Sequence, residues 1–127
     1  MVDSPHEGFR ARLVASLVGY LSHPDDDLRL TAVEALLMST WDPAWTPALV
    51  VDAGGAAPIV ACLSDEVDQV RNAAVQLVAI LVRKGEAGLL IEAGAGKALE
   101  KLCKDPDPLI RRRAAGALEA LDSGPCT

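Results

Sequence analysis

Three nine-residue segments of the chain align with one another without gaps, and they begin at Leu28, Val70 and Ile110. In each segment an aliphatic residue precedes an Arg, and an apolar pair that begins with Ala follows three residues after the Arg. The segments lie 42 and 40 residues apart. A period of this length is typical of repeat proteins, in which each unit buries its apolar face by stacking on its neighbours. The chain is therefore constrained to fold as a stack of similar units.

The spacing of apolar residues predicts that each segment lies on a long α-helix. In the second and third segments these residues fall at i, i+4, i+7, i+8 and i+11, which is one face of an α-helix. The two sets are Val70, Ala74, Leu77, Val78 and Leu81, and Ile110, Ala114, Ala117, Leu118 and Leu121. Acidic runs at 24–27, 65–68 and 105–108 precede the three helices. Acidic residues suit the free N–H groups and the positive dipole end of a helix start.

Glycines mark a second, shorter part of the repeat. The segment Val51–Gly55 corresponds to Ile91–Ala95, and in each a short helix is expected to end at Gly54 or Gly94, because glycine accepts the left-handed conformation. Each full unit is predicted to contain a short helix, a Gly break, a medium helix (56–63 or 96–103), an acidic turn and a long helix. The first unit is less regular, and we expect one helix there from a capping box at Ser4–Glu7 to about Ser22.

Length and composition favour one compact domain over residues 1–127. The chain has 127 residues, of which 50% are hydrophobic and only 3% aromatic. Small aliphatic side chains suit helices that pack closely on helices. The predicted units cover approximately 5–40, 46–83 and 84–122, with a short tail at 123–127.

The second unit resembles an armadillo repeat. In that family an acidic-Ala-Gly segment, here 52–54, ends the first helix, an apolar-Pro-apolar segment, here 57–59, opens the second, and an Ala pair, here 73–74, marks the third. Residues 84–121 resemble another copy with Ala98 at the Pro position, and residues 9–39 resemble a partial copy. Three Arg positions are instead similar to HEAT repeats: Arg29, Arg71 and Arg111. In that family an Asp before the long helix and this Arg often bond, within or between units. The resemblance implies an all-α, armadillo/HEAT-like right-handed solenoid of about three repeats.

The resemblance implies a protein–protein interaction module, an adaptor or scaffold that binds a peptide or domain of another protein on the concave face lined by the third helices. The candidate members of that face are Leu30, Glu34, Met38, Asn72, Gln76, Ile80, Arg112, Gly116 and Ala120. A simpler interpretation is that these are merely solvent-facing helix positions.

Recognition of nuclear signals is not expected. Importin-like members of the family carry a Trp and, four residues later, an Asn on the long helix. The matching positions here hold Glu34 and Met38, Gln76 and Ile80, and Gly116 and Ala120.

Two alternative hypotheses of function are also compatible with the sequence. The chain could be a fragment or a self-associating unit of a larger repeat assembly, because the ends of a short solenoid leave apolar surface for stacking. It could also be a chaperone cofactor that grips a folded domain, as other armadillo-like folds do.

Two smaller features are candidates for partner binding. Trp41 and Trp45 lie in a Pro-containing loop, where they would form an exposed patch or, as we favour, fold back to fill the irregular first unit. The run 111–113 consists of three Arg residues. It would bind an acidic partner or, as we favour, act as a polar cap on the last helix.

Charge argues against nucleic acid as a partner. The net charge is −6, with −7 in residues 1–82 and +1 in residues 83–127, and an acidic surface repels phosphate. The acidic run 25–27 lacks the alternating ligands and Gly of a calcium loop, so we expect neither a metal nor a cofactor. The sequence also contains no nucleophile elbow, phosphate loop or zinc spacing, so catalysis is not expected.

The three cysteines, Cys62, Cys103 and Cys126, have no regular spacing and predict no disulfide framework. Cys62 and Cys103 are expected to pack as small free hydrophobes, which favours a reducing, cytoplasmic location. The apolar runs are too short for a membrane span, and the first residues lack the pattern of a signal peptide, so no membrane partner is expected.

Overall fold

The computed structural model describes the backbone of residues 5–121 and the side chains of residues 8–121, and this part of the chain is helical with no strand. The helices are α1 (Pro5–Tyr20), α2 (Asp26–Ser39), α3 (Pro47–Val51), α4 (Ala56–Cys62), α5 (Asp68–Leu81), α6 (Ala87–Glu92), α7 (Ala95–Leu102) and α8 (Pro108–Ala120). A kinked segment, η1 (Val82–Glu86), joins α5 to α6, and Gly85 within it has a φ of 96°. The first helix ends two residues before the predicted Ser22, and the predicted capping residue Ser4 lies outside the described residues.

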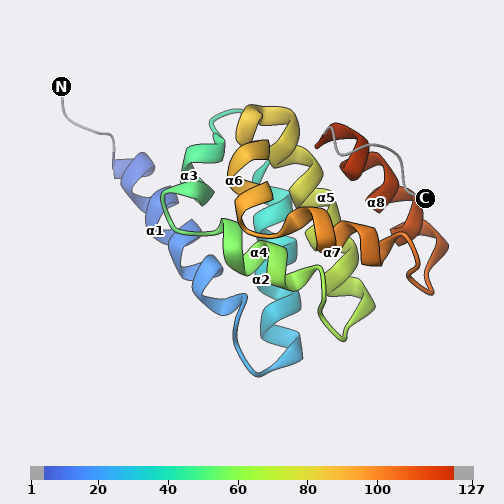
Figure 1. The fold of residues 1–127 in the computed structure, drawn as a ribbon. Coiled ribbons are helices and arrows are strands. Elements are labelled where there is room, and N and C mark those ends of the chain that lie inside the picture. The colour runs from blue at the N-terminus through green and yellow to red at the C-terminus, as the bar shows by residue number, and fades with distance from the viewer. Residues whose placement is uncertain (1–4, 122–127) are drawn as a thin grey trace.

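The helices form two layers (Figure 1). The long helices α2, α5 and α8 form one layer, in which α5 packs between α2 and α8. The helices α1, α4 and α7 pack on α2, α5 and α8 in turn, and the short helices α3 and α6 contact α1 and α4. Each predicted unit therefore contributes one long helix to a common face. The right-handed sense of the solenoid stays a prediction.

The predicted apolar faces of the long helices form the core. In α5, Val70, Ala74, Leu77 and Val78 are fully buried, and Leu81 is nearly so. The corresponding residues of α8 are buried as well. The 3.6-residue period of the sequence therefore locates the buried stripe of both helices correctly, because it follows from helix geometry alone.

The glycines at the break are needed for two different reasons. Gly54 has a φ of 72° and Gly94 a φ of 94°, in the left-handed region that other residues rarely adopt. Gly55 has ordinary backbone angles, but a Cβ atom there would lie 2.6 Å from Cγ1 of Val50 and 2.9 Å from its carbonyl oxygen. The close approach of α3 to the start of α4 therefore requires a residue without a side chain at position 55.

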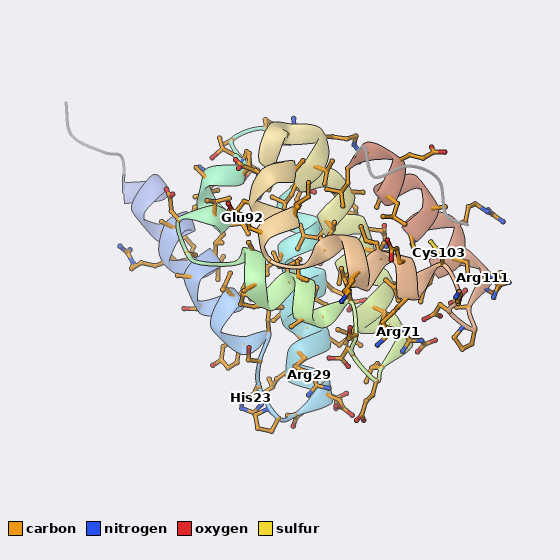
Figure 2. The ribbon with its side chains drawn as sticks, viewed as in Figure 1. His23, Arg29, Arg71, Glu92, Cys103 and Arg111 are labelled. Atoms are coloured by element: carbon orange, nitrogen blue, oxygen red, sulfur yellow. The ribbon has the colours of Figure 1, made fainter. Side chains whose placement is uncertain are left out.

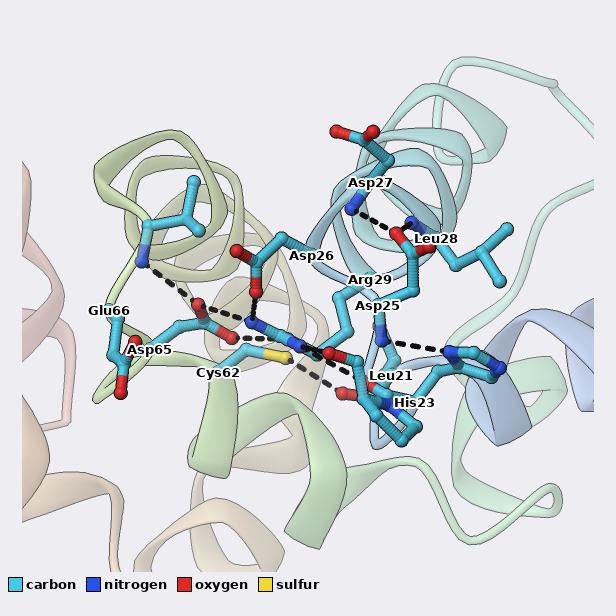
Figure 3. A network of polar contacts seen from close by, with 12 residues as sticks. Leu21, His23, Asp25, Asp26, Asp27, Leu28, Arg29, Cys62, Asp65 and Glu66 are labelled. Carbon is cyan, nitrogen blue, oxygen red and sulfur yellow. Dashed lines mark hydrogen bonds and ion pairs between the residues drawn. The ribbon is translucent and has the colours of Figure 1, made fainter.

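An Arg–Asp pair joins each of the first two long helices to the turn before the next one. Arg29 of α2 donates from Nε to Oδ2 of Asp65 at 2.8 Å. Arg71 of α5 donates from Nε to Oδ1 of Asp105, also at 2.8 Å. The two acceptors lie next to the core, since their side chains are only 9% and 5% exposed. Figure 3 shows the first pair and the polar contacts around it. These pairs connect neighbouring units through side chains.

The acidic runs have two roles: the one predicted from the helix dipole, and the bond to an Arg that the resemblance to HEAT repeats implied. Asp25 and Asp107 are N-caps whose carboxylates accept backbone N–H groups of α2 and α8. Asp65 instead binds Arg29. Burial alone would raise the pKa of Asp65, but the hydrogen bonds from Arg29 and from the N–H of Val67 outweigh it and lower this pKa.

Of the two described cysteines, Cys62 is a buried free thiol as expected and Cys103 differs from expectation. Cys62 is a buried free thiol that donates to the carbonyl oxygen of Leu21 at 3.8 Å, and burial raises its pKa to about 11. Cys103 takes part in a disulfide bond, so the prediction that it packs as a free thiol is wrong. The argument for a reducing location therefore loses its basis. Cys126 lies outside the described residues.

Over residues 5–121, the helices are too short or too polar to cross a bilayer.

Candidate protein-interaction face

The layer of long helices α2, α5 and α8, called the row from here on, carries nine of the predicted binding residues, three on each helix. In the structure none of the nine is buried: Glu34, Met38, Arg112, Gly116 and Ala120 are exposed, and Leu30, Asn72, Gln76 and Ile80 are partly buried. The predicted side chains are therefore accessible at the surface of this row. A binding site also requires that several of these side chains lie close together.

A hollow of about 340 Å³ lies between α5 and α8 and includes four of the predicted residues. Gln76 and Ile80 line it from α5, and Gly116 and Ala120 line it from α8. The floor is made largely of small side chains, because Ala and Gly on α8 leave room beside α5. A Cβ atom built on Gly116 would meet nothing within 4 Å. The hollow is therefore open enough to accept a side chain of another molecule.

Two Arg residues that were not assigned to this face also line the hollow. Arg83 follows the end of α5, and Arg113 projects from α8 and donates from Nη1 to Oδ1 of Asn72. Asn72 is thus held by the next unit, and Arg112 is absent from the lining. The helical stripe that contains Gln76 and Ile80 continues to Arg83, so spacing could have found that residue. The choice of Arg113 over Arg112 depends on how α8 is rotated against α5.

The residues on α2 stand apart from this hollow. Leu30, Glu34 and Met38 are not among its lining residues, and Met38 presents an exposed side chain on the same row. The described structure therefore joins the predicted residues of α5 and α8, while those of α2 share only the helix row.

The two Trp residues have different environments. Trp45 is 8% exposed and lines a second hollow of about 320 Å³ beside Phe9 and Leu13 of α1, whereas Trp41 is 75% exposed. The interpretation that both rings fold back is therefore wrong for Trp41, although it holds for Trp45. The indole Nε1 of Trp45 is buried without a hydrogen-bond partner among the described residues.

The three residues of the Arg run 111–113 have different contacts. Arg111 (Figure 2) donates to backbone carbonyls. Arg113 donates to Asn72, and Arg112 is exposed. Within residues 5–121 there is no cluster of three or more His, Cys, Asp or Glu side chains that could hold a metal ion.

Comparison with known proteins gives matches among solved structures. No protein-family model matches the chain, and no curated protein does. A designed armadillo repeat protein is 29% identical with a TM-score of 0.80, over 91% of this chain and 50% of its own. A designed armadillo repeat protein in complex with the peptide (KR)4 is 29% identical with a TM-score of 0.76, over 85% of this chain and 46% of its own. An engineered protein is 28% identical with a TM-score of 0.78, over 88% of this chain and 46% of its own.

The chain is therefore an all-α helical repeat protein. Its similarity to the designed armadillo repeat proteins shows that the repeat is armadillo-like. The chain spans about half the length of these solved structures.

Proposed function

We propose that the chain is a protein-interaction module, with a binding rather than a catalytic role, and that it holds a peptide or domain of another protein on the row α2, α5 and α8. The observation that carries this proposal is the hollow between α5 and α8, in which predicted residues from two units meet. A similar designed armadillo repeat protein forms a complex with a peptide, which supports a peptide-binding role for this fold.

The charge of the hollow argues against a basic partner such as the (KR)4 peptide. Arg83 and Arg113 both line it, and a basic side chain placed there would meet like charge. In this chain, other residues also occupy the positions at which importin-like proteins carry Trp and Asn. We therefore propose that the segment in contact with the hollow is neutral or acidic.

The test is to fill the hollow without disturbing the fold. Gly116→Leu places a large side chain in open space, and it replaces a helical Gly with a better helix former. Gly96→Leu is the matched control, because Gly96 is also helical with open space around it but lies on α7, outside the hollow. Partners captured on the immobilised wild-type chain are identified by mass spectrometry and compared with those captured on each variant. Loss of a partner from G116L alone supports the proposal, and retention of every partner by G116L contradicts it.

Self-association is the second candidate, and the C-terminal end of the stack argues against it. Glu100 and Glu119 occupy the positions that Val60 and Ala79 hold one unit earlier. Val60 is buried and Ala79 partly buried, so a further copy stacked on the C-terminal end would bury two carboxylates. We expect light scattering to give the mass of a monomer at every concentration, and a mass that rises with concentration would favour self-association.

A further inference from the structure

The two Arg–Asp pairs repeat the same set of hydrogen bonds. In each, Nε donates to one carboxylate oxygen at 2.8 Å and Nη2 donates to the other, at 3.2 Å for Arg29 and 3.3 Å for Arg71. In each, Nη1 donates to the carbonyls six and five residues earlier in the chain, at 2.9 and 3.1 Å. The backbone carbonyls therefore orient the guanidinium, and the Asp of the next unit binds its free edge.

Arg111 is the third residue of this series and has only half of these bonds. Its Nη1 donates to the carbonyl oxygens of Asp105 and Pro106, six and five residues earlier, at 2.6 and 3.2 Å. Among the described residues, its Nε and Nη2 have no acceptor, and its side chain is exposed where those of Arg29 and Arg71 are mostly buried. Figure 2 shows the three Arg residues in succession along one edge of the molecule.

We propose that Arg111 is a binding site for the carboxylate of an Asp or Glu side chain on a partner protein. The carbonyls hold the guanidinium in the orientation that binds Asp65 and Asp105 elsewhere in the chain. A fixed guanidinium presents two parallel N–H groups that match the two oxygens of a carboxylate. Because the guanidinium is already oriented, little side-chain entropy is lost when the carboxylate binds.

A second copy of this chain does not supply the missing carboxylate through the same contact. The residue six positions before Arg29, where Asp65 and Asp105 stand in the later units, is His23. Its Nδ1 accepts the N–H of Asp25 at 3.0 Å, so in the neutral ring the proton is on Nε2. An imidazole in this state cannot replace a carboxylate as the partner of an Arg. A second copy stacked in the register of the repeat therefore leaves the free edge of Arg111 without a carboxylate.

The charges around Arg111 favour an acidic segment. Lys104, seven residues before Arg111, and the adjacent Arg112 are both exposed, and they outnumber the single carboxylate of the N-cap Asp107, which accepts the N–H of Leu109. The nearest acid that follows on α8 is Glu119, eight residues along the helix. That separation corresponds to about 12 Å, beyond which exposed charges are largely screened. An acidic segment therefore meets net positive charge at this end of the protein.

The test follows the Nε–H resonance of Arg111 by NMR in the full chain. The probe is an eight-residue peptide of alternating Asp and Ser, and sodium acetate at equal carboxylate concentration is the comparison. We expect the peptide to shift the Arg111 resonance and slow its exchange with water, while Arg71 stays unchanged. In the free protein, an Arg111 Nε–H as protected as that of Arg71 would show that the chain itself fills the site and would overturn the proposal. Equal shifts with acetate would overturn the assignment to a protein segment.

Matched variants separate a specific site from general attraction. Arg111→Gln and Arg112→Gln remove the same charge from neighbouring residues, and Arg111→Lys keeps the charge but removes the paired N–H groups. We expect R111Q and R111K to lower the association constant for the Asp-Ser peptide about fivefold, and R112Q less than about twofold. Equal losses in R111Q and R112Q, with R111K unaffected, refute the site. Backbone amide spectra confirm the fold of each variant, and G116L should leave this binding unchanged, which separates it from the proposed interaction face.

Discussion

The Arg71–Asp105 pair gives the sharpest prediction about stability. Arg71→Gln removes both hydrogen bonds to the Asp105 carboxylate and the two bonds from Nη1 to the carbonyls of Asp65 and Glu66. The Asp105 side chain is 5% exposed, so its carboxylate depends on protein donors for its hydrogen bonds. One donor remains, since the N–H of Asp107 binds Oδ2 at 2.9 Å. The variant therefore leaves a buried carboxylate with a single partner.

The magnitude follows from that geometry. Removing one member of a buried ion pair costs about 3–5 kcal/mol. The remaining Asp107 donor and the 15% exposure of Arg71 place the loss at the low end, about 3 kcal/mol. Unfolding of domains of this kind requires about 5–15 kcal/mol, so the change is a large part of the total.

Urea denaturation followed by circular dichroism at the helical band measures this loss. With a slope of about 1–3 kcal/mol per molar urea, the midpoint should fall by roughly 1 to 3 M. Arg112→Gln is the control, because Arg112 is exposed and should change the free energy of unfolding by less than about 0.5 kcal/mol. In the R71Q background, Asp105→Asn should restore part of the loss, since it removes the unpaired charge. Equal free energies of unfolding for R71Q and R112Q would show that the Arg71–Asp105 pair does not hold the units together.

Three further predictions test other parts of the fold. Gly55→Ala should destabilise the chain by about 1–3 kcal/mol through its clash with Val50, while Gly96→Ala should be neutral or slightly stabilising; equal midpoints in thermal denaturation would contradict this. Cys62 should resist a thiol reagent at pH 8 until the chain unfolds, because its pKa is raised to about 11, and fast labelling of the folded chain would refute its burial. The lowered pKa of Asp65 contributes stability above the unfolded value of about 3.9 that is lost as pH falls through the folded pKa. The difference in free energy of unfolding between wild type and Asp65→Asn should therefore shrink below about pH 4, and a constant difference would count against it.

The buried faces and the Gly breaks were predictable because they are local. The period of 3.6 residues placed Val70 and Leu77 on the core side of α5 before any neighbouring helix was known. The left-handed conformation of Gly94 likewise follows from the end of a short helix and the freedom of glycine. Neither inference required knowledge of which element lies opposite.

The candidate site was predictable only in outline. Helix spacing put Gln76 and Gly116 on the outward side of two neighbouring long helices, and the structure places both in one hollow. The same spacing gave Arg112 rather than Arg113, because a one-residue difference corresponds to a rotation of about 100° that only packing against α5 decides. The tendency of large rings to be buried predicted the same environment for Trp41 and Trp45, although one ring is exposed and the other packs near α1.

The sequence by itself determined that this protein is a stack of helical units, where each long helix buries its apolar stripe, and where glycine is required to end a short helix. Those properties depend on residues within a few turns of one another. The resemblance to HEAT repeats implied that the repeated Arg residues bond to an Asp before a long helix, within or between units. Only the tertiary structure decided that Asp65 and Asp105 each bind the Arg of the preceding unit, and that Arg111 has no such acid among the described residues. Each ion pair joins residues more than thirty positions apart, so its geometry depends on how the units stack rather than on the pattern within any one of them.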